Sequence, residues 1–326
     1  MEKSEKKWNF LLTGPIHKKV QNFLDTKANI VFAPIGISSR GMSDLLKQQQ
    51  TEALIVRGGK VNQDIMTASS RLKVIVKHGV GYNNIDVQAA KALNLPVFYT
   101  PYANYESVAE HTLALIFTLT KKINLFDQEM KINHNWPKSK FIISELKNKC
   151  IGLIGMGRIG KRVIQLLAPL DMHVIIYDPF VKKNDLPEGV EYFNNLKELA
   201  KKSDIISIHC PLNTNTKGIF GKEELKSMKP TAYLINTARG GIIDEIALIE
   251  VLKNGLIAGA ALDTFAEEPI SPENPLLNME NVILSPHVAG TTEESFFRMG
   301  NTAVELALNL LEGKKREIPI DNLIIE

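Results

Sequence analysis

Three glycines between an apolar run and a helix-like pattern constrain the fold of this chain more than any other feature. The stretch "KCIGLIGMGRIGKRVIQLLAPLDMHVIIYDP" sets Gly155, Gly157 and Gly160 in a G-x-G-x-x-G pattern. Gly155 permits a tight turn, Gly157 lets the backbone approach a pyrophosphate, and Gly160 lets the following helix pack on the sheet. The pattern therefore predicts a strand, a turn and a helix that bind a dinucleotide, with the pyrophosphate at the amino end of the helix.

The acid that closes the next apolar run predicts which dinucleotide binds. Asp178 ends "HVIIYD", and a carboxylate there accepts hydrogen bonds from both ribose hydroxyls of adenosine and repels the extra 2′-phosphate of NADP. Pro179 and Phe180 follow, so no arginine comes immediately after the acid to receive that phosphate. A lone G-x-G-x-x-G is a weak signal, but strand, helix and acid agree here. We therefore expect NAD rather than NADP.

Composition excludes several other classes of protein. The net charge is +3 and the lysines are scattered, so we expect no nucleic-acid partner. No apolar run approaches the roughly 20 residues of a membrane span, and no signal peptide is evident, so we expect a cytoplasmic protein with no membrane partner. Cys150 and Cys210 both border apolar runs; two cysteines make no metal cluster, and we expect buried free thiols.

Short β-rich runs alternate with helical patterns, which predicts an α/β fold. Five candidate strands lie in the first hundred residues, in "NFLLTG", "NIVFAPI", "EALIVRGG", "LKVIVKHG" and "LPVFYTP". Six more lie in "IGLIG", "HVIIYD", "DIISIHC", "AYLINTA", "IAGAALD" and "NVILSPH", which is the strand count of a full dinucleotide-binding sheet. A long apolar helix is predicted after Asn104, and Thr291 to about Glu312 reads as a helix with no further strand, packed on the first domain.

Three stretches near predicted strand ends bring together residues suited to hydride transfer to a keto acid. "NTARGG", "LDTFAEEP" and "SPHVAG" supply one arginine, one or two glutamates and one histidine. Histidine suits the general acid, a carboxylate can orient its ring, and an arginine can anchor a substrate carboxylate and polarise the carbonyl. Taken singly, His287 after a strand is more often structural, Arg239 can be a surface residue of a turn, and Glu267 and Glu268 can be a solvated loop.

Together these motifs resemble the D-isomer-specific 2-hydroxyacid dehydrogenase family. "HGVGYNNIDVQAA", "NYESVAEHTLALI", "GLIGMGRIGKRV", "NTARGGIIDEIAL", "AALDTFAEEP" and "NVILSPHVAGTTEES" match its blocks in order, from Lys77 to Ser295. Within the family, the chain is most similar to short 3-phosphoglycerate dehydrogenase-like members. One departure is Asn83 in "GYNNID", where the family usually has aspartate.

The resemblance implies a role for each matching position. The catalytic residues would be His287 as acid and base, Glu268 as its carboxylate partner, and Arg239, which would also bind substrate together with His287. Substrate carboxylate would meet the backbone N–H groups of Val80 and Gly81. No metal is expected. The NAD-binding residues would be Gly155, Gly157, Arg158, Ile159, Gly160, Asp178, Cys210, Pro211, Thr237, Ala238, Asp263, which would face the nicotinamide amide, and Gly290.

The resemblance also implies an organisation of two Rossmann-like parallel-sheet domains with an interdomain cleft. We expect a discontinuous, flavodoxin-like substrate-binding domain at residues 1–103 plus 288–326. An NAD-binding Rossmann domain is expected at residues 104–287. The family further implies a homodimer built largely on the helix after Asn104.

The expected reaction is reversible hydride transfer between NAD and a D-2-hydroxy acid, and the substrate stays open. D-3-phosphoglycerate, the substrate of serine biosynthesis, would need cations for its phosphate, and Arg57 and Lys60 around Gly58 in "VRGGK" are candidates unless that loop is simply solvated. Glyoxylate or hydroxypyruvate reduction is the main alternative and needs no phosphate site. A third possibility is an NAD-sensing corepressor-like binding protein, which would not need the Arg, Glu and His set.

Overall fold

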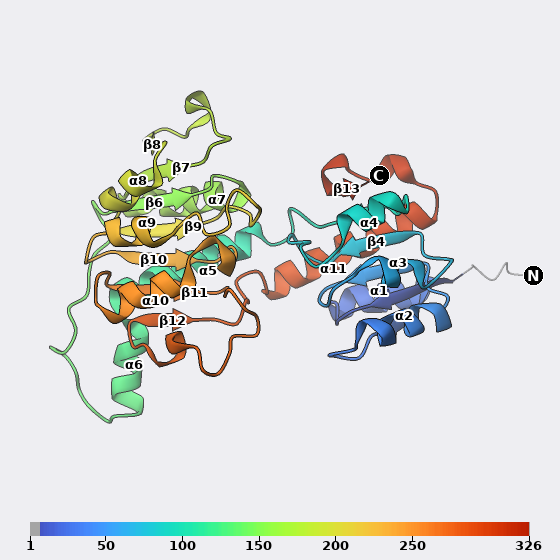
Figure 1. The fold of residues 1–326 in the computed structure, drawn as a ribbon, viewed down its shortest axis with the longest axis horizontal. Helices are drawn as coiled ribbons and strands as arrows, with labels where there is room; N and C mark the ends of the chain where they lie inside the picture. Colours follow the sequence, from blue (N-terminus) through green and yellow to red (C-terminus); the bar gives the residue numbers. More distant parts are fainter. Residues whose placement is uncertain (1–6, 326) are drawn as a thin grey trace, which may run out of the picture. The chain divides into compact units, whose positions relative to one another are not determined.

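Two units, each built on its own sheet, make up the computed structural model (Figure 1). The structure describes residues 7–325. Unit 1 combines the chain up to Asn104 with the segment from Thr291, and unit 2 runs from Tyr105 to Gly290. The first six residues and the last, which the predicted domain ranges 1–103 and 288–326 include, lie outside the described part. The predicted boundaries at 103 and 287 differ by one and three residues from the observed ones.

The sheet of unit 1 has the strand order β13-β5-β4-β3-β1-β2. All pairs are parallel except β13 with β5, which is antiparallel. Without β13 this is the flavodoxin-like order, in which ligands bind beyond the carboxyl ends of β1 and β3. The strands are β1 (Trp8–Leu12), β2 (Ala28–Phe32), β3 (Ala53–Val56), β4 (Val74–Lys77), β5 (Val97–Phe98) and β13 (Leu323–Ile325).

Helices cover both faces of this sheet, because its central strands are apolar on both sides. One core cluster joins the strands to α1 and α11, and a second joins them to α2, α3 and α4. The predicted helix near the carboxyl end, α11, therefore packs on unit 1. The helices are α1 (Lys18–Lys27), α2 (Ser39–Gln48), α3 (Gln63–Thr67), α4 (Val87–Ala92) and α11 (Glu293–Leu311), with short 3-10 turns at Lys315–Glu317 and Ile320–Asn322.

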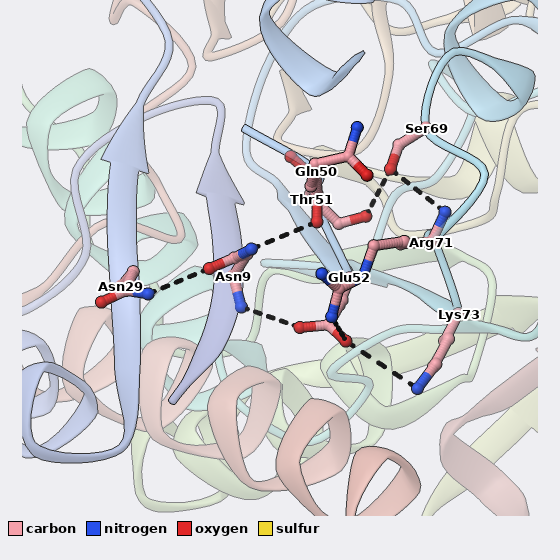
Figure 2. Close-up of polar contacts among 8 residues, drawn as sticks. All are labelled: Asn9, Asn29, Gln50, Thr51, Glu52, Ser69, Arg71 and Lys73. Carbon is pink, nitrogen blue, oxygen red and sulfur yellow. Dashed lines mark hydrogen bonds and ion pairs between the residues drawn. The ribbon is translucent and has the colours of Figure 1, made fainter. Parts of the chain in front are cut away.

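A buried carboxylate ties together the amino ends of the strands in unit 1 (Figure 2). The Glu52 side chain is 1% exposed and accepts hydrogen bonds from Arg71 Nη2 at 2.8 Å and from the backbone N–H of Asn9 at 3.2 Å. Lys73 Nζ lies 3.9 Å away. A buried charge needs such partners, so this cluster is structural, at the opposite end of β3 from Arg57.

The sheet of unit 2 is wholly parallel, in the order β12-β11-β10-β9-β6-β7-β8. This is the Rossmann order with one strand added beyond β11, and its order reverses between β6 and β9. The strands are β6 (Cys150–Ile154), β7 (His173–Tyr177), β8 (Val190–Tyr192), β9 (Ile205–Ile208), β10 (Tyr233–Asn236), β11 (Gly259–Leu262) and β12 (Val282–Leu284).

The helices of unit 2 also form two layers. One core cluster contains residues of α5 and α7, and the other contains residues of α8, α9 and α10. The predicted α/β class with two parallel-strand sheets is thus confirmed. The helices are α5 (Tyr105–Lys121), α6 (Ile123–Lys131), α7 (Arg158–Leu167), α8 (Leu196–Lys202), α9 (Lys222–Ser227) and α10 (Glu245–Lys253), with 3-10 turns at Ala168–Leu170, Lys183–Asp185, Gly240–Ile242 and Pro275–Asn278.

The structure corrects three predictions about individual elements. All eleven predicted strands form, but β8 and β13 were missed, so the NAD-binding sheet has seven strands rather than six. Both missed strands have three residues. The strands β5 and β12 are no longer than this, but they were predicted because they lie in the longer runs "LPVFYTP" and "NVILSPH". The predicted long helix is two helices, because Lys122 adopts φ 51° between α5 and α6.

Two expectations from composition have different outcomes. Among residues 7–325 no helix is long and apolar enough to cross a membrane. Both cysteines are free, but only Cys150 is buried and Cys210 is half-buried. Burial nevertheless raises the pKa of each thiol to about 11, so both are protonated near neutral pH.

Candidate active site

Most of the predicted cofactor and catalytic residues of unit 2 follow the carboxyl ends of its parallel strands. Gly155 comes after β6, Asp178 after β7 and Cys210 after β9, while Thr237, Asp263 and Ser285 follow β10, β11 and β12. Parallel strands place these ends at one edge of the sheet. The reversal of strand order between β6 and β9 makes this edge the expected ligand site.

The glycine turn has the geometry that each glycine was predicted to provide. Gly155 has φ +99°, and a Cβ there would lie 2.8 Å from the backbone nitrogen of Cys210. A Cβ on Gly160 would lie 2.3 Å from the carbonyl oxygen of Gly155, so α7 packs directly on the turn. A Cβ on Gly157 would meet nothing within 4 Å. The turn is therefore closed by Gly155 and Gly160 and open at Gly157.

The open side of the turn fits a dinucleotide pyrophosphate. Gly157 is the N-cap of α7, and in the described part of the chain no side chain caps this helix. The amino end of α7, which includes Arg158 and Ile159, can therefore present backbone N–H groups and the positive end of the helix dipole to an anion.

Two backbone N–H groups hold the Asp178 carboxylate beside the glycine turn. Its Oδ2 accepts the N–H of Met156, within the glycine turn, at 2.8 Å, and its Oδ1 accepts the N–H of Phe180 at 2.9 Å. A carboxylate has about four lone-pair sites, so each oxygen keeps one for a ribose hydroxyl. The same carboxylate would repel a 2′-phosphate, and this favours NAD.

The neighbouring strand ends supply the other predicted cofactor residues. Cys210 and Pro211 follow β9, with the Cys210 backbone against Gly155. Thr237 and Ala238 follow β10. The Thr237 hydroxyl lies 3.1 Å from the Thr112 hydroxyl of α5. The Asn236 side chain closes this turn, because its Oδ1 accepts the N–H of Ala238 at 3.0 Å and its Nδ2 donates to the carbonyl of Arg239 at 2.9 Å.

His287 and Glu268 form the closest polar pair of the predicted catalytic set. His287 Nδ1 lies 2.7 Å from Glu268 Oε2. The other oxygen of Glu268 accepts the N–H of Phe265 at 3.1 Å, which orients the carboxylate. The His287 side chain is 44% exposed. Nδ1–H can therefore donate to Glu268 and leave Nε2 available to exchange a proton with a substrate.

Arg239 follows β10 on a loop that packs tightly against the Glu268 loop. A Cβ on Gly240 would lie 1.9 Å from the carbonyl carbon of Phe265, so only glycine allows this approach. Arg239 Nη1 donates to the carbonyl of Ala238 at 2.6 Å. Burial lowers the pKa of Arg239, and the nearby charge of Glu268 opposes this effect. The guanidinium stays charged and is only partly hydrated, which suits an anion site.

Glu245, for which no role was predicted, supports the Glu268 loop from α10. Its Oε2 accepts the N–H of Ala266 at 2.9 Å, and its Oε1 accepts Nδ2–H of Asn274 at 2.9 Å. The signal was present in "GGIIDEIAL", where Asp244 caps α10 and Glu245 begins it. The target of the Glu245 side chain, however, lies 21 residues away in the chain.

Asp263 is more deeply buried than its predicted contact with the nicotinamide amide would suggest. The residue is 0% exposed, and its oxygens accept hydrogen bonds from Ser285, Val288 and Ala289. These donors lie on both sides of His287 in the chain. Gly290 follows them as the last residue of unit 2. The contact of Asp263 with the nicotinamide amide stays a prediction.

The predicted substrate residues Arg57 and Gly58 lie in unit 1, after β3. The Thr13 hydroxyl accepts the N–H groups of Arg57 and Gly58 at 2.9 and 3.1 Å and so fixes the loop. The Arg57 guanidinium carbon lies 4.8 Å from the ring centre of Phe296. Lys60 is exposed. Arg57 is thus held by packing, whereas Lys60 is a solvated cation.

Val80 and Gly81 follow β4 at the same edge of the unit 1 sheet. Across residues 7–325, no protein acceptor is found for the backbone N–H of either residue. The N–H of Gly79, by contrast, donates to the Thr100 hydroxyl at 2.9 Å. The next loop is anchored by Asn84, whose Nδ2 donates to the carbonyl of Gly59. Two adjacent donors of this kind suit a carboxylate.

Comparison with known proteins shows the family of the chain. Residues 113–289, more than half of the chain, match the family described as D-isomer specific 2-hydroxyacid dehydrogenase, NAD binding domain. The chain is 35% identical over 316 residues to a D-3-phosphoglycerate dehydrogenase of Archaeoglobus fulgidus, covering 96% of this chain and 58% of that protein. It is 40% identical over 266 residues to a glyoxylate reductase of Thermofilum pendens, covering 80% of this chain and 77% of that protein.

A solved structure shares the fold over nearly the whole chain. It is the D-lactate dehydrogenase of Aquifex aeolicus complexed with NAD and lactic acid, with a TM-score of 0.85 and 28% identity over 98% of this chain and 99% of that one. The chain spans 58% of the length of the archaeal phosphoglycerate dehydrogenases that it matches. The match to an NAD binding domain confirms the predicted cofactor.

Proposed function

The chain belongs to the D-isomer specific 2-hydroxyacid dehydrogenase family, and on that basis we propose that it transfers hydride reversibly between NAD and a D-2-hydroxy acid. The observation that carries the proposal is the His287–Glu268 pair, 2.7 Å apart. This pair follows the strands of the same sheet edge as the glycine turn. An acid–base histidine beside a dinucleotide site is what reduction of a carbonyl requires.

In the direction of reduction, bound NADH supplies the hydride. His287 Nε2 gives a proton to the carbonyl oxygen of the keto acid, and Glu268 stabilises the ring through Nδ1 while it is charged. Arg239 binds the substrate carboxylate and polarises the carbonyl. Oxidation reverses these steps, with His287 accepting the hydroxyl proton.

The substrate carboxylate is proposed to bind the N–H groups of Val80 and Gly81, since neither has a protein acceptor within residues 7–325. Among substrates we favour D-3-phosphoglycerate, with Arg57 and Lys60 holding the phosphate. Lys77 supports this loop, because its buried Nζ donates to the carbonyl of Arg57 at 2.9 Å and to Asn84 Oδ1 at 3.1 Å. This substrate would place the enzyme in serine biosynthesis in the cytoplasm. Glyoxylate or hydroxypyruvate is the second candidate, favoured by the 40% identical glyoxylate reductase.

NADH absorbance of the purified protein tests the proposal in two arms. One arm contains NAD with D-3-phosphoglycerate, and the other contains NADH with glyoxylate, hydroxypyruvate or pyruvate. We expect turnover in the first arm, with KM for phosphoglycerate raised in Arg57→Gln. Turnover in the second arm alone would assign a 2-keto acid reductase and leave the Arg57 loop structural. Binding of NADH without turnover in either arm would favour the corepressor-like alternative.

A homodimer is also proposed, with a second copy covering α6 and the segment after it. The apolar face of α5 is buried in its own unit, so this helix offers less surface than expected from the sequence. The free apolar side chains lie farther along, where Trp136 is 80% exposed and Ile142 is 88% exposed. Large apolar side chains that are exposed along one segment are typical of a protein interface.

Sedimentation equilibrium measures this assembly. We expect a dimer for the unaltered chain and a monomer for Trp136→Glu with Ile142→Glu, because two charges at an apolar interface oppose association. Ile246→Glu is the matched control, since Ile246 is 82% exposed on α10. A monomeric parent protein, or an equal effect of the control, would refute the proposed interface.

A further inference from the structure

A single buried carboxylate fixes the loop that carries His287. Asp263 Oδ1 accepts the Ser285 hydroxyl at 2.6 Å and the N–H of Val288 at 2.9 Å. Its Oδ2 accepts the N–H of Ala289 at 2.9 Å. These three donors lie before and after His287, so the carboxylate at the end of β11 holds both sides of that residue.

We call the Asp263 carboxylate and its three donors, Ser285, Val288 and Ala289, the clamp. The loop needs this clamp because His287 has an unfavourable backbone conformation. Its φ is +54°, in the left-handed region where a non-glycine residue costs about 1–2 kcal/mol. Its backbone N–H donates to the carbonyl of Ser285 at 3.0 Å. Contacts on either side must therefore keep this conformation, and with it the approach of the ring to Glu268.

The clamp extends to a histidine on α5 that has no role in the proposed reaction. Ser285 has one hydroxyl proton and gives it to Asp263, so its oxygen must accept from His111 Nε2, 3.2 Å away. Nε2 therefore carries a proton. It also lies 3.9 Å from Asp263 Oδ1. The chain of contacts runs from α5 through Ser285 and Asp263 to the backbone beside His287.

We propose that His111 and Ser285 are positioning residues for the reaction of His287. They act through Asp263 to keep the loop from Ser285 to Ala289 in the conformation that sets His287 against Glu268. The part of this inference that concerns turnover rests on the proposed function. The clamp itself can be measured without substrate or NAD.

Steady-state kinetics test the proposal with two variants that remove a hydrogen-bonding side chain and one that keeps a donor at position 111. Ser285→Ala and His111→Leu are each expected to lower kcat by about 10- to 100-fold, because a small misplacement of a catalytic group has an effect of this size. The KM values for NADH and keto acid should stay unchanged. His111→Gln, which keeps an N–H donor, should recover most of kcat. The kcat of the double variant Ser285→Ala with His111→Leu should be no lower than that of Ser285→Ala alone, since both changes break the same chain of contacts.

Thr120→Ala is the matched control on the same helix. Its buried hydroxyl donates to the carbonyl of Ile116 at 2.8 Å and contacts no residue of the clamp. We expect a similar small loss of stability and an unchanged kcat. A rise in KM for NADH without a fall in kcat would overturn the proposal, since Ser285 and His111 would then belong to the cofactor pocket. Equal kcat values for His111→Gln and His111→Leu would overturn the donor role.

Amide hydrogen exchange of the protein without ligand gives the second readout. In Ser285→Ala and His111→Leu the amides of Val288 and Ala289 should exchange about tenfold faster, as expected for the loss of one hydrogen bond. They should be unchanged in Thr120→Ala. Unchanged exchange in all variants would refute the clamp. If the parent protein has no turnover on any substrate, the proposed function fails, and the exchange rates still decide the clamp.

Discussion

Replacing His287 with alanine is expected to lower kcat by about 10²–10⁴-fold, the usual contribution of a general acid and base. The loss should fall on the chemical step, because the glycine turn and Asp178, which are proposed to hold the cofactor, are separate from the imidazole. NADH fluorescence titration should therefore give an unchanged Kd. Retention of turnover by this variant, with the parent protein active, would assign the proton transfer to another group.

The Glu268→Gln variant keeps the His287 ring and removes the charge of its carboxylate partner. The glutamine has a single acceptor oxygen, so it can accept from His287 Nδ1 only by giving up the N–H of Phe265, and it carries no charge to stabilise the protonated ring. We expect a smaller fall in kcat than for His287→Ala. Glu267→Gln is the matched control, since Glu267 is exposed and adjacent in the chain. Equal effects at positions 267 and 268 would show that general surface charge, and not the pair, matters.

Features that depend on a few neighbouring residues were predictable from the sequence. The glycine turn is one example, because Gly155, Gly157 and Gly160 have their effects within six positions of one another. The eleven apolar strands were also found, since strands buried on both faces read as continuous apolar runs. The end of β7 just before Asp178 followed from the same local pattern.

Features that depend on distant pairing were not predictable. β13 is only three residues long and is defined by its antiparallel pairing with β5. The role of Asp263 depends on donors 22 to 26 residues farther along the chain, and that of His111 on a serine 174 residues away. No local period or composition reports such contacts. His111 lies in the family motif "NYESVAEHTLALI", but the motif does not show that His111 contacts Ser285. That contact arises only because α5 packs on the sheet.

Alanine at Gly160 should lower stability, whereas alanine at Gly157 should lower NADH affinity and leave stability unchanged. Gly160→Ala places a methyl group 2.3 Å from the carbonyl oxygen of Gly155, so the helix or the turn must shift. We expect a loss of about 1–3 kcal/mol in the free energy of unfolding, as for other overpacked sites. Urea unfolding followed by circular dichroism measures it.

Gly157→Ala should leave the free energy of unfolding within about 0.5 kcal/mol of the parent value. The residue has φ −72°, which alanine adopts readily, and its Cβ would meet nothing within 4 Å. The new methyl group would instead occupy the space through which the pyrophosphate approaches the backbone. NADH affinity should therefore fall about tenfold, or ~1.4 kcal/mol. A Gly157→Ala protein that binds NADH normally would place the pyrophosphate elsewhere, whatever its stability, because the open side of the turn would then have no function that glycine alone can serve.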